Sequence, residues 1–162
     1  MRTIYPPHKT TAEADEITVF LAGSIEMGLA ENWQQQVESA LAGFENVCLL
    51  NPRRIDWDAS WKQEKRNPQF NEQVSWELAG LEQADVIVCY LAPGTKSPVS
   101  MLELGLFARS GKLVVCCPEG FWRKGNIDIV CEKYGVRQVG SLTEMVRYLE
   151  STITTLQYKN EK

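Results

Sequence analysis

The fold is indicated first by the stretch Asp85-Val86-Ile87-Val88-Cys89-Tyr90-Leu91-Ala92-Pro93-Gly94. Residues 85–91 are almost continuously apolar, which predicts a buried strand, and Pro93-Gly94 ends it. A helix is expected over 98–109, with Gly111 just past its end, and a second buried strand over 113–117. Strands that are apolar throughout and alternate with helices are typical of a parallel sheet covered on both faces.

The same alternation continues outward from this stretch. We expect further strands over 17–22, 46–50 and 136–139, and further helices over 31–41, 69–83, 126–133 and 141–155. The sequence therefore predicts one α/β domain over residues 17–158, built on a doubly wound, five-stranded parallel sheet of the flavodoxin-like or Rossmann-like kind. Residues 1–16 are polar and contain Pro6-Pro7, which predicts a flexible or draped N-terminal arm.

Ligands of such folds bind outside the carboxyl ends of the strands. We therefore expect one crevice to be faced by the segments that follow the predicted strands, namely 23–24, 51–61, 92–100 and 118–126.

Composition narrows the class of function. The chain has 162 residues, of which 44% are hydrophobic and 23% charged, as in an ordinary globular domain. Its net charge of −4, without a long basic run, argues against a nucleic-acid polymer as partner. No apolar run reaches the ~20 residues of a membrane span, so we expect no membrane partner and a cytoplasmic location. The five cysteines show no CxxC spacing and are expected to be reduced core residues.

Several kinds of catalytic site lack their usual residues. The one histidine, His8, lies in the predicted arm, so a histidine base or a His/Cys metal site has no support. Neither GxGxxG nor GxxxxGK[ST] occurs, and we expect no cofactor. The predicted crevice holds carboxylates, amides, serines and aromatic residues. This inventory suits glycosidic-bond chemistry, which needs little beyond two placed carboxyl groups.

Two glutamates are the first candidates, and each has a structural alternative. Glu103 is expected in the first turn of the helix over 98–109, where the helix N-terminus would favour an ionised carboxylate. Ser100-x-x-Glu103 is also a capping-box pattern, so Glu103 could simply start the helix. Glu77 lies in the middle of the predicted helix 69–83, where an exposed charged face is the ordinary alternative.

The remaining candidates also have ordinary explanations. Trp57, Trp61 and Trp76 could stack on a nucleobase, although buried packing is the commoner role of tryptophan. Asp56 is typical of a turn, and Asn126 is typical of a turn or a helix cap.

Together these segments resemble the nucleoside 2-deoxyribosyltransferase family, from about Thr18 to Val136. The resemblance rests on Phe20-Leu21-Ala22-Gly23-Ser24-Ile25, on Glu77 eight residues before Asp85, on Met101-Leu102-Glu103-Leu104-Gly105 and on Gly125-Asn126. The loop over 51–61 resembles a bacterial branch labelled nucleoside 2-deoxyribosyltransferase-like.

The resemblance implies roles for the candidate residues. Glu103 would attack C1′ of deoxyribose and form a covalent glycosyl-enzyme, while Glu77 would protonate the departing base and deprotonate the incoming one. Asn126 would reach into the site of a neighbouring subunit, which implies a homodimer or a larger homo-oligomer. The expected ligands are a small nucleoside or nucleotide and a free nucleobase, as in nucleotide salvage. The residues expected to bind substrate are Gly23, Ser24, Ser97, Asp56, Trp57 and Trp61.

The implied mechanism has physical requirements. Two displacements at C1′ retain its configuration, and carboxyl groups about 5–5.5 Å apart are typical of such sites. Glu77 must be protonated when Glu103 attacks, so we expect its pKa to be raised by burial or by Glu103.

The chain departs from the pattern of either branch at three positions. The transferases usually carry an aspartate six residues before the nucleophile for the 5′-hydroxyl, but this position is Ser97, as in the related 2-deoxynucleoside 5′-monophosphate N-hydrolases. Those hydrolases have an arginine at the position of Glu26, which would repel phosphate, and a tyrosine at the position of Phe20. A replacement cation could come from Arg53, Arg54 or Arg123.

Three functions therefore remain open at the level of sequence. Transfer of deoxyribose between nucleobases is the leading hypothesis. Hydrolysis of a deoxynucleoside or its 5′-monophosphate is the second, and a non-catalytic nucleotide-binding sensor on the same fold is the third. A flavodoxin-type electron carrier fits the fold but not Gly23-Ser24, which is no phosphate-binding run.

Overall fold

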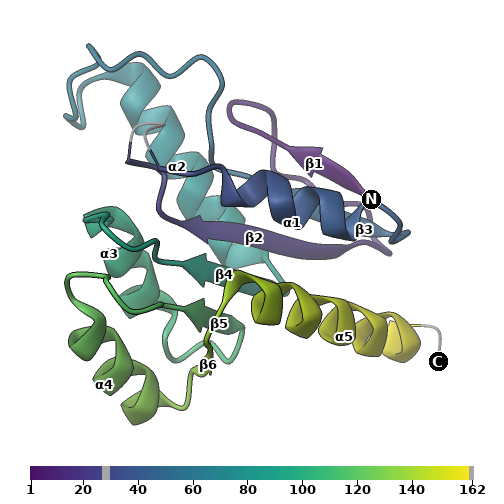
Figure 1. Ribbon diagram of the computed structural model, residues 1–162. Helices are drawn as coiled ribbons and strands as arrows, with labels where there is room; N and C mark the ends of the chain where they lie inside the picture. Colours follow the sequence, from purple (N-terminus) through teal and green to yellow (C-terminus); the bar gives the residue numbers. More distant parts are fainter. Residues whose placement is uncertain (27–29, 161–162) are drawn as a thin grey trace.

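A parallel sheet of six strands forms the centre of the computed structural model, which describes residues 1–26 and 30–160 (Figure 1). The strands lie in the order β1-β3-β2-β4-β5-β6, and every neighbouring pair is parallel. Their bounds are Arg2–Ile4 for β1, Ile17–Gly23 for β2, Val47–Leu50 for β3, Val86–Tyr90 for β4, Leu113–Cys116 for β5 and Arg137–Val139 for β6.

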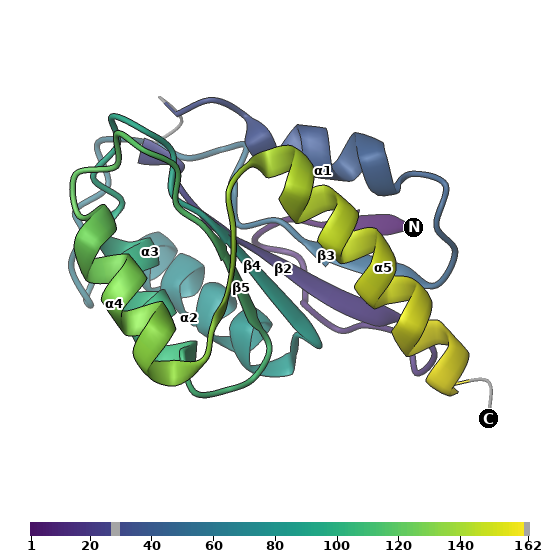
Figure 2. The ribbon, with the colours of Figure 1, turned by 60° about the horizontal axis from the view of Figure 1, so that its bottom comes forward.

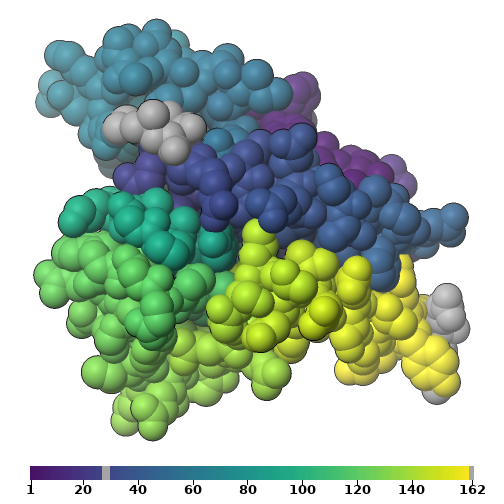
Figure 3. All heavy atoms as spheres, in the orientation of Figure 1, coloured from purple at the N-terminus to yellow at the C-terminus, as the bar shows by residue number. Residues whose placement is uncertain are grey.

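Helices cover both faces of the sheet, as Figure 2 shows. They are α1 (Trp33–Leu41), α2 (Pro68–Gln83), α3 (Pro98–Phe107), α4 (Lys124–Tyr134) and α5 (Leu142–Asn160). One face packs against α2, α3 and α4, and the other against α1 and α5. The space-filling view shows α1 and α5 in direct contact on the second face (Figure 3).

The strands separate two hydrophobic cores because successive side chains point to opposite faces. Phe20 and Ala22 of β2 belong to the core under α2, α3 and α4, whereas Val19 and Leu21 belong to the core under α1 and α5. All seven residues of β2 are buried. The five cysteines are free and buried. This two-sided burial explains why the strands are apolar throughout.

The predicted doubly wound α/β fold is confirmed, but the prediction of five strands is wrong. The sixth strand, β1, lies within the expected arm and pairs with β3 through Thr3 and Leu49. Three residues that include Arg2 and Thr3 are too short and too polar to show a strand pattern. The rest of the arm is held against α2, because the Trp76 indole N–H donates to the carbonyl of His8 at 2.6 Å.

The strand order places a switch point between β2 and β4. From β2 the chain passes through α1 to β3 on one side, and from β4 it passes through α3 to β5 on the other side, across opposite faces of the sheet. Ligands of doubly wound folds bind at the carboxyl ends of strands at such a point. No helix in the described part of the chain is both long enough and apolar enough to cross a bilayer.

Candidate active site

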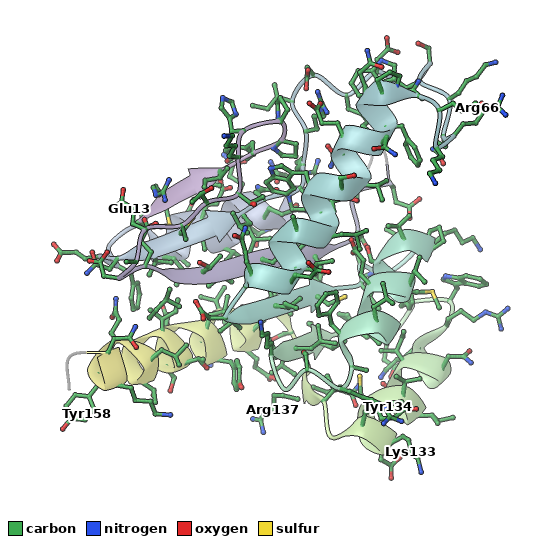
Figure 4. The ribbon with its side chains drawn as sticks, turned by 180° about the vertical axis from the view of Figure 1, so that it is seen from behind. Glu13, Arg66, Lys133, Tyr134, Arg137 and Tyr158 are labelled. Atoms are coloured by element: carbon green, nitrogen blue, oxygen red, sulfur yellow. The ribbon has the colours of Figure 1, made fainter. Side chains whose placement is uncertain are left out.

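A pocket of about 480 Å³ opens beside the carboxyl ends of β2 and β4. Three of the four expected segments contribute to its wall: the residues after β2, the loop between β3 and α2, and the start of α3. The first turns of α2 complete it. The lining includes Gly23, Glu26, Pro52, Arg53, Arg54, Trp57, Phe70, Gln73, Glu77, Ser97, Val99, Ser100 and Glu103. Seen from behind, α2 and α3 run along the same face of the sheet (Figure 4).

The two candidate glutamates line this same pocket from different helices. Glu77 is half-buried on α2, and Glu103 is buried on α3 with 8% of its surface exposed. Burial raises the pKa of Glu77 to about 7. Burial, followed by the negative charge of Glu77, raises the pKa of Glu103 to about 8. Because each charge changes the cost of the other, the two carboxyl groups titrate as a coupled pair.

The expectation that Glu103 lies in the first turn of its helix, where the helix N-terminus would favour an ionised carboxylate, is wrong. The helix begins at Pro98, so Glu103 lies in its second turn rather than its first. The favourable field of a helix N-terminus falls off within the first turn. Burial then dominates and raises the pKa of Glu103 above its ordinary value.

The structural alternatives for both glutamates also fail. The capping box does not form, because the Ser100 hydroxyl donates to the carbonyl of Gly23 at 2.8 Å and the N-cap residue of α3 is Ser97. Glu77 does not lie on a solvent-exposed helix face but in the pocket wall. Neither carboxyl group is explained by helix formation alone.

Gln73 is a pocket residue that the sequence analysis missed. Its side-chain amide donates to Glu77 Oε1 at 2.8 Å and to the carbonyl of Pro52 at 2.9 Å. The bond to Glu77 opposes the rise in the pKa of Glu77 that burial causes. Among the described residues, Gln73 Oε1 has no hydrogen-bond partner. The signal was the spacing of four residues within one helix, which puts Gln73 and Glu77 on the same face.

Gly23 and Ser24 join the end of β2 to the segment that follows β4 in the pocket wall. Gly23 has a φ of 141°, and a Cβ there would collide with the backbone of Tyr90. The Ser24 hydroxyl accepts from the N–H of Ala92 at 2.9 Å and lies 2.7 Å from the hydroxyl of Ser97. Ser97 lines the pocket, whereas Ser24 lies fully buried behind it.

In the loop over 51–61, only one of the three predicted substrate-binding residues reaches the pocket. Trp57 lines it, and its buried indole N–H has no partner among the described residues. Trp61 packs edge-on against Trp57 with ring centroids 5.3 Å apart. Asp56 is exposed and forms an ion pair of 2.7 Å with Arg54, whose guanidinium also lies over Trp61. Asp56 and Trp61 therefore support the loop from outside the pocket.

The fourth expected segment does not face the crevice. No residue of 118–126 is in the pocket lining, and Asn126 is exposed near the start of α4. This segment follows β5, which is separated from β2 by β4, so it begins beyond the switch point. In the described residues, no three His, Cys, Asp or Glu side chains are grouped as metal ligands would be.

Comparison with known proteins gives one family and several similar structures. The sequence model of a family described as nucleoside 2-deoxyribosyltransferase like matches residues 16–121. A conserved protein from Enterococcus faecalis V583 has a similar structure, with a TM-score of 0.58 and 12% identity over 85% of this chain and 99% of that one. The CMP N-glycosidase of Clostridium botulinum has a TM-score of 0.51 and 15% identity over 82% of this chain and 98% of that one. No curated protein matches the sequence.

Proposed function

Because this chain belongs to the nucleoside 2-deoxyribosyltransferase-like family, we propose that it cleaves the N-glycosidic bond of a 2-deoxyribonucleoside and transfers the deoxyribosyl group to another nucleobase. The observation that carries the proposal is the pair Glu77 and Glu103. Two carboxyl groups share one pocket, with raised and coupled pKa values. Two carboxyl groups of this kind can supply the one acid and the one nucleophile that the reaction needs.

In the first step, a carboxylate oxygen of Glu103 attacks C1′ and forms a glycosyl ester. The bond between C1′ and the base nitrogen breaks, and that nitrogen takes the proton of Glu77. In the second step, a nitrogen of the incoming base attacks C1′ while Glu77 removes its proton. The ester bond breaks, and Glu103 leaves as a carboxylate. Two displacements at one carbon retain its configuration.

The mechanism requires one proton on the pair, and this proton must be on Glu77. Burial raises the pKa of both groups above the ordinary value, so the pair can hold a proton near neutral pH. A bound nucleobase adds an acceptor beside Glu77, and a hydrogen bond to that acceptor favours the protonated acid. We therefore infer that a bound substrate keeps this proton on Glu77.

Hydrolysis is the second candidate, in which water takes the place of the incoming base. It would give its proton to Glu77 and its hydroxyl to C1′. The similarity in fold to a CMP N-glycosidase favours this reading. The two reactions share the glycosyl-enzyme and differ in whether the pocket admits water at C1′. A non-catalytic sensor is disfavoured, because two buried carboxyl groups cost stability without aiding binding.

We further propose that two copies of the chain associate through α3 and α4. Val99, Leu102 and Leu106 form an exposed apolar stripe on α3, with 55%, 64% and 59% of their surfaces accessible. Val99 also lines the pocket, so a copy covering this stripe would lie at the pocket mouth. In such a pair we expect Asn126 of the partner subunit to contribute to the site. Sedimentation tests this: Leu102→Glu should turn the dimer into a monomer, whereas the matched Leu78→Glu on α2 should leave it a dimer. A Leu102→Glu protein that is still a dimer, or a wild-type protein that is a monomer, contradicts the proposal.

The reaction is tested by incubating the protein with deoxynucleosides and their 5′-monophosphates, with and without free adenine. Chromatography then separates the products. A new deoxynucleoside that forms only with adenine establishes transfer, while free base without acceptor establishes hydrolysis. Glu103→Ala should abolish both, and Glu82→Gln, an exposed change on α2, should not affect either. Full activity of Glu103→Ala, or no turnover of any donor, would refute the proposed chemistry.

A further inference from the structure

Glu26 places a carboxylate in the pocket wall and against the backbone of another loop. It follows β2 and has a left-handed φ of 48°. Its Oε1 accepts hydrogen bonds from the backbone N–H groups of Lys96 at 2.8 Å and Ser97 at 2.7 Å. The hydroxyl of Ser97 lies 3.4 Å from the same oxygen. One carboxylate oxygen therefore accepts hydrogen bonds from two successive N–H groups.

These two N–H groups lie at the start of a helix, a position that suits an anion. They immediately precede α3, whose N-cap residue Ser97 makes no side-chain capping bond of its own. Successive N–H groups at a helix N-terminus form a concavity suited to phosphate. Three hydroxyl groups, from Ser24, Thr95 and Ser97, lie beside it within 2.7–3.0 Å of one another. Glu26 fills this anion position with a group of the chain itself.

The nearby cationic side chains bond to groups of the chain other than Glu26. Arg53 donates to Gln34 and to the carbonyls of Ala30 and Glu31. Arg54 pairs with Asp56 and Glu72. Lys96 and Arg123 both lie over the ring of Trp122, with their charged groups 4.5 and 4.4 Å from its centroid. None of these cations is paired with Glu26 in the described part of the chain, so its carboxylate keeps its negative charge beside the pocket.

The proposed chemistry constrains how a nucleoside would lie in the pocket. The departing base must meet Glu77 on α2, and C1′ must meet Glu103 on α3. The sugar's other end would then extend toward the start of α3, where Ser97 and Glu26 line the same pocket. Among the described residues, Oε2 of Glu26 has no hydrogen-bond partner, so it can accept from a hydroxyl group there.

We propose that Glu26 selects a 2-deoxynucleoside with a free 5′-hydroxyl and excludes the 5′-monophosphate. This inference rests on the proposed function, because it names the substrate class of the same site. A 5′-hydroxyl donates to the carboxylate, whereas a phosphate meets a like charge and finds its N–H donors taken. Glu26 thus distinguishes a 5′-hydroxyl from a 5′-phosphate, which the uncharged Ser97 alone does not do.

The test compares kcat/KM for a deoxynucleoside and its 5′-monophosphate in three proteins. The wild-type protein should prefer the nucleoside by about 100-fold or more, because like charges in a pocket are costly. Glu26→Gln removes the charge but keeps an acceptor oxygen, and Glu26→Ala also frees the N–H groups. The preference should fall at least about tenfold in Glu26→Gln and further in Glu26→Ala. Glu45→Gln, an exposed change before β3, is the matched control and should keep the wild-type ratio.

Two outcomes of this comparison overturn the inference: a wild-type preference for the monophosphate, or the same ratio in all three proteins. A second measurement does not depend on turnover. Inorganic phosphate is titrated into wild-type protein and into Glu26→Ala while the amide signals of Lys96 and Ser97 are followed by NMR. Saturable shifts in Glu26→Ala alone support the inference even if no nucleoside is cleaved. Shifts in both proteins, or in neither, contradict it. If the alanine variant does not fold, Glu26→Gly repeats the titration, because glycine tolerates the left-handed backbone at this position.

Discussion

Glu77 on α2 and Glu103 on α3 face the same pocket, and the charge of Glu77 is the second largest cause, after burial, of the raised pKa of Glu103. Along the chain, β4 separates the two helices. The doubly wound topology is what brings the two carboxyl groups together at one end of the sheet. Their coupling is the property from which the chemistry of the site follows.

The coupling predicts a specific effect of removing one charge. In Glu77→Gln the negative neighbour is lost, so the pKa of Glu103 should fall below about 8. It should remain above the ordinary 4.5, because burial is the larger cause. Carbon-13 NMR titration of the glutamate carboxyl groups measures this directly. An unchanged pKa of Glu103 would mean that the two groups do not interact.

As a general acid and base, Glu77 should contribute about 10²–10⁴-fold to turnover. The kcat of Glu77→Gln compared with that of the wild-type protein measures this contribution.

Gln73 should set the pKa of Glu77. Its amide stabilises the ionised form of Glu77 by a hydrogen bond of 2.8 Å. In Gln73→Leu this bond is absent while burial remains, so the pKa of Glu77 should rise above about 7. Because Glu77 acts as the acid, the alkaline limb of the kcat/KM profile should move to higher pH. Gln36→Leu, an exposed change on α1, should leave the profile in place, and a shift toward lower pH in Gln73→Leu would contradict this role.

The pair should make the protein less stable as the pH rises. Both folded-state pKa values lie above the ordinary 4.5, so the unfolded chain loses these protons first. Stability contributed by the protonated pair is complete below about pH 4.5 and is lost progressively up to about pH 8. Glu103→Gln should therefore be more stable than wild type at pH 8, by on the order of 1–3 kcal/mol.

Urea unfolding of wild type and Glu103→Gln at pH 5 and pH 8 measures this difference. The gain should be largest at pH 8 and small at pH 5. Glu82→Gln removes an exposed carboxyl group from α2 and should show no such pH dependence. If Glu103→Gln is destabilised equally at both pH values, ionisation of the buried Glu103 does not lower the free energy of unfolding.

Gly23 should be intolerant of any side chain. A Cβ at this position would collide with the backbone of Tyr90 and force β2 away from β4 beside the pocket. Gly23→Ala should lower the free energy of unfolding by about 3 kcal/mol or more. Gly43→Ala is the matched control, because a Cβ at Gly43 meets nothing within 4 Å. Similar unfolding midpoints for the two variants would contradict the close approach of β2 and β4.

The sequence predicted most of the fold because the central strands are buried on both faces. Each of β2, β3, β4 and β5 is an uninterrupted apolar run that local patterns can identify. The missed strand β1 has three residues, and its position depends on pairing with β3 rather than on its own composition. Edge strands of this kind carry too little pattern to be predicted from sequence.

The site was predicted less completely because its properties arise from contacts across the chain. Both glutamates could be selected as candidates, but the protonation of Glu103 depends on burial that no local pattern reveals. Gln73 carried a helical spacing that could have been used. The hydrogen bonds from Lys96 and Ser97 to Glu26 join residues about seventy positions apart, so only the fold brings them together.

The central claim is that Glu103 becomes covalently bound to deoxyribose. The most direct measurement is mass spectrometry of peptides from a reaction that is quenched rapidly, with a deoxynucleoside as donor and no acceptor present. We predict that the peptide containing Glu103 gains the mass of one deoxyribosyl group, and that adding adenine removes it with formation of a new deoxynucleoside. Release of base without any adduct on Glu103, or an adduct on another residue, would contradict the mechanism.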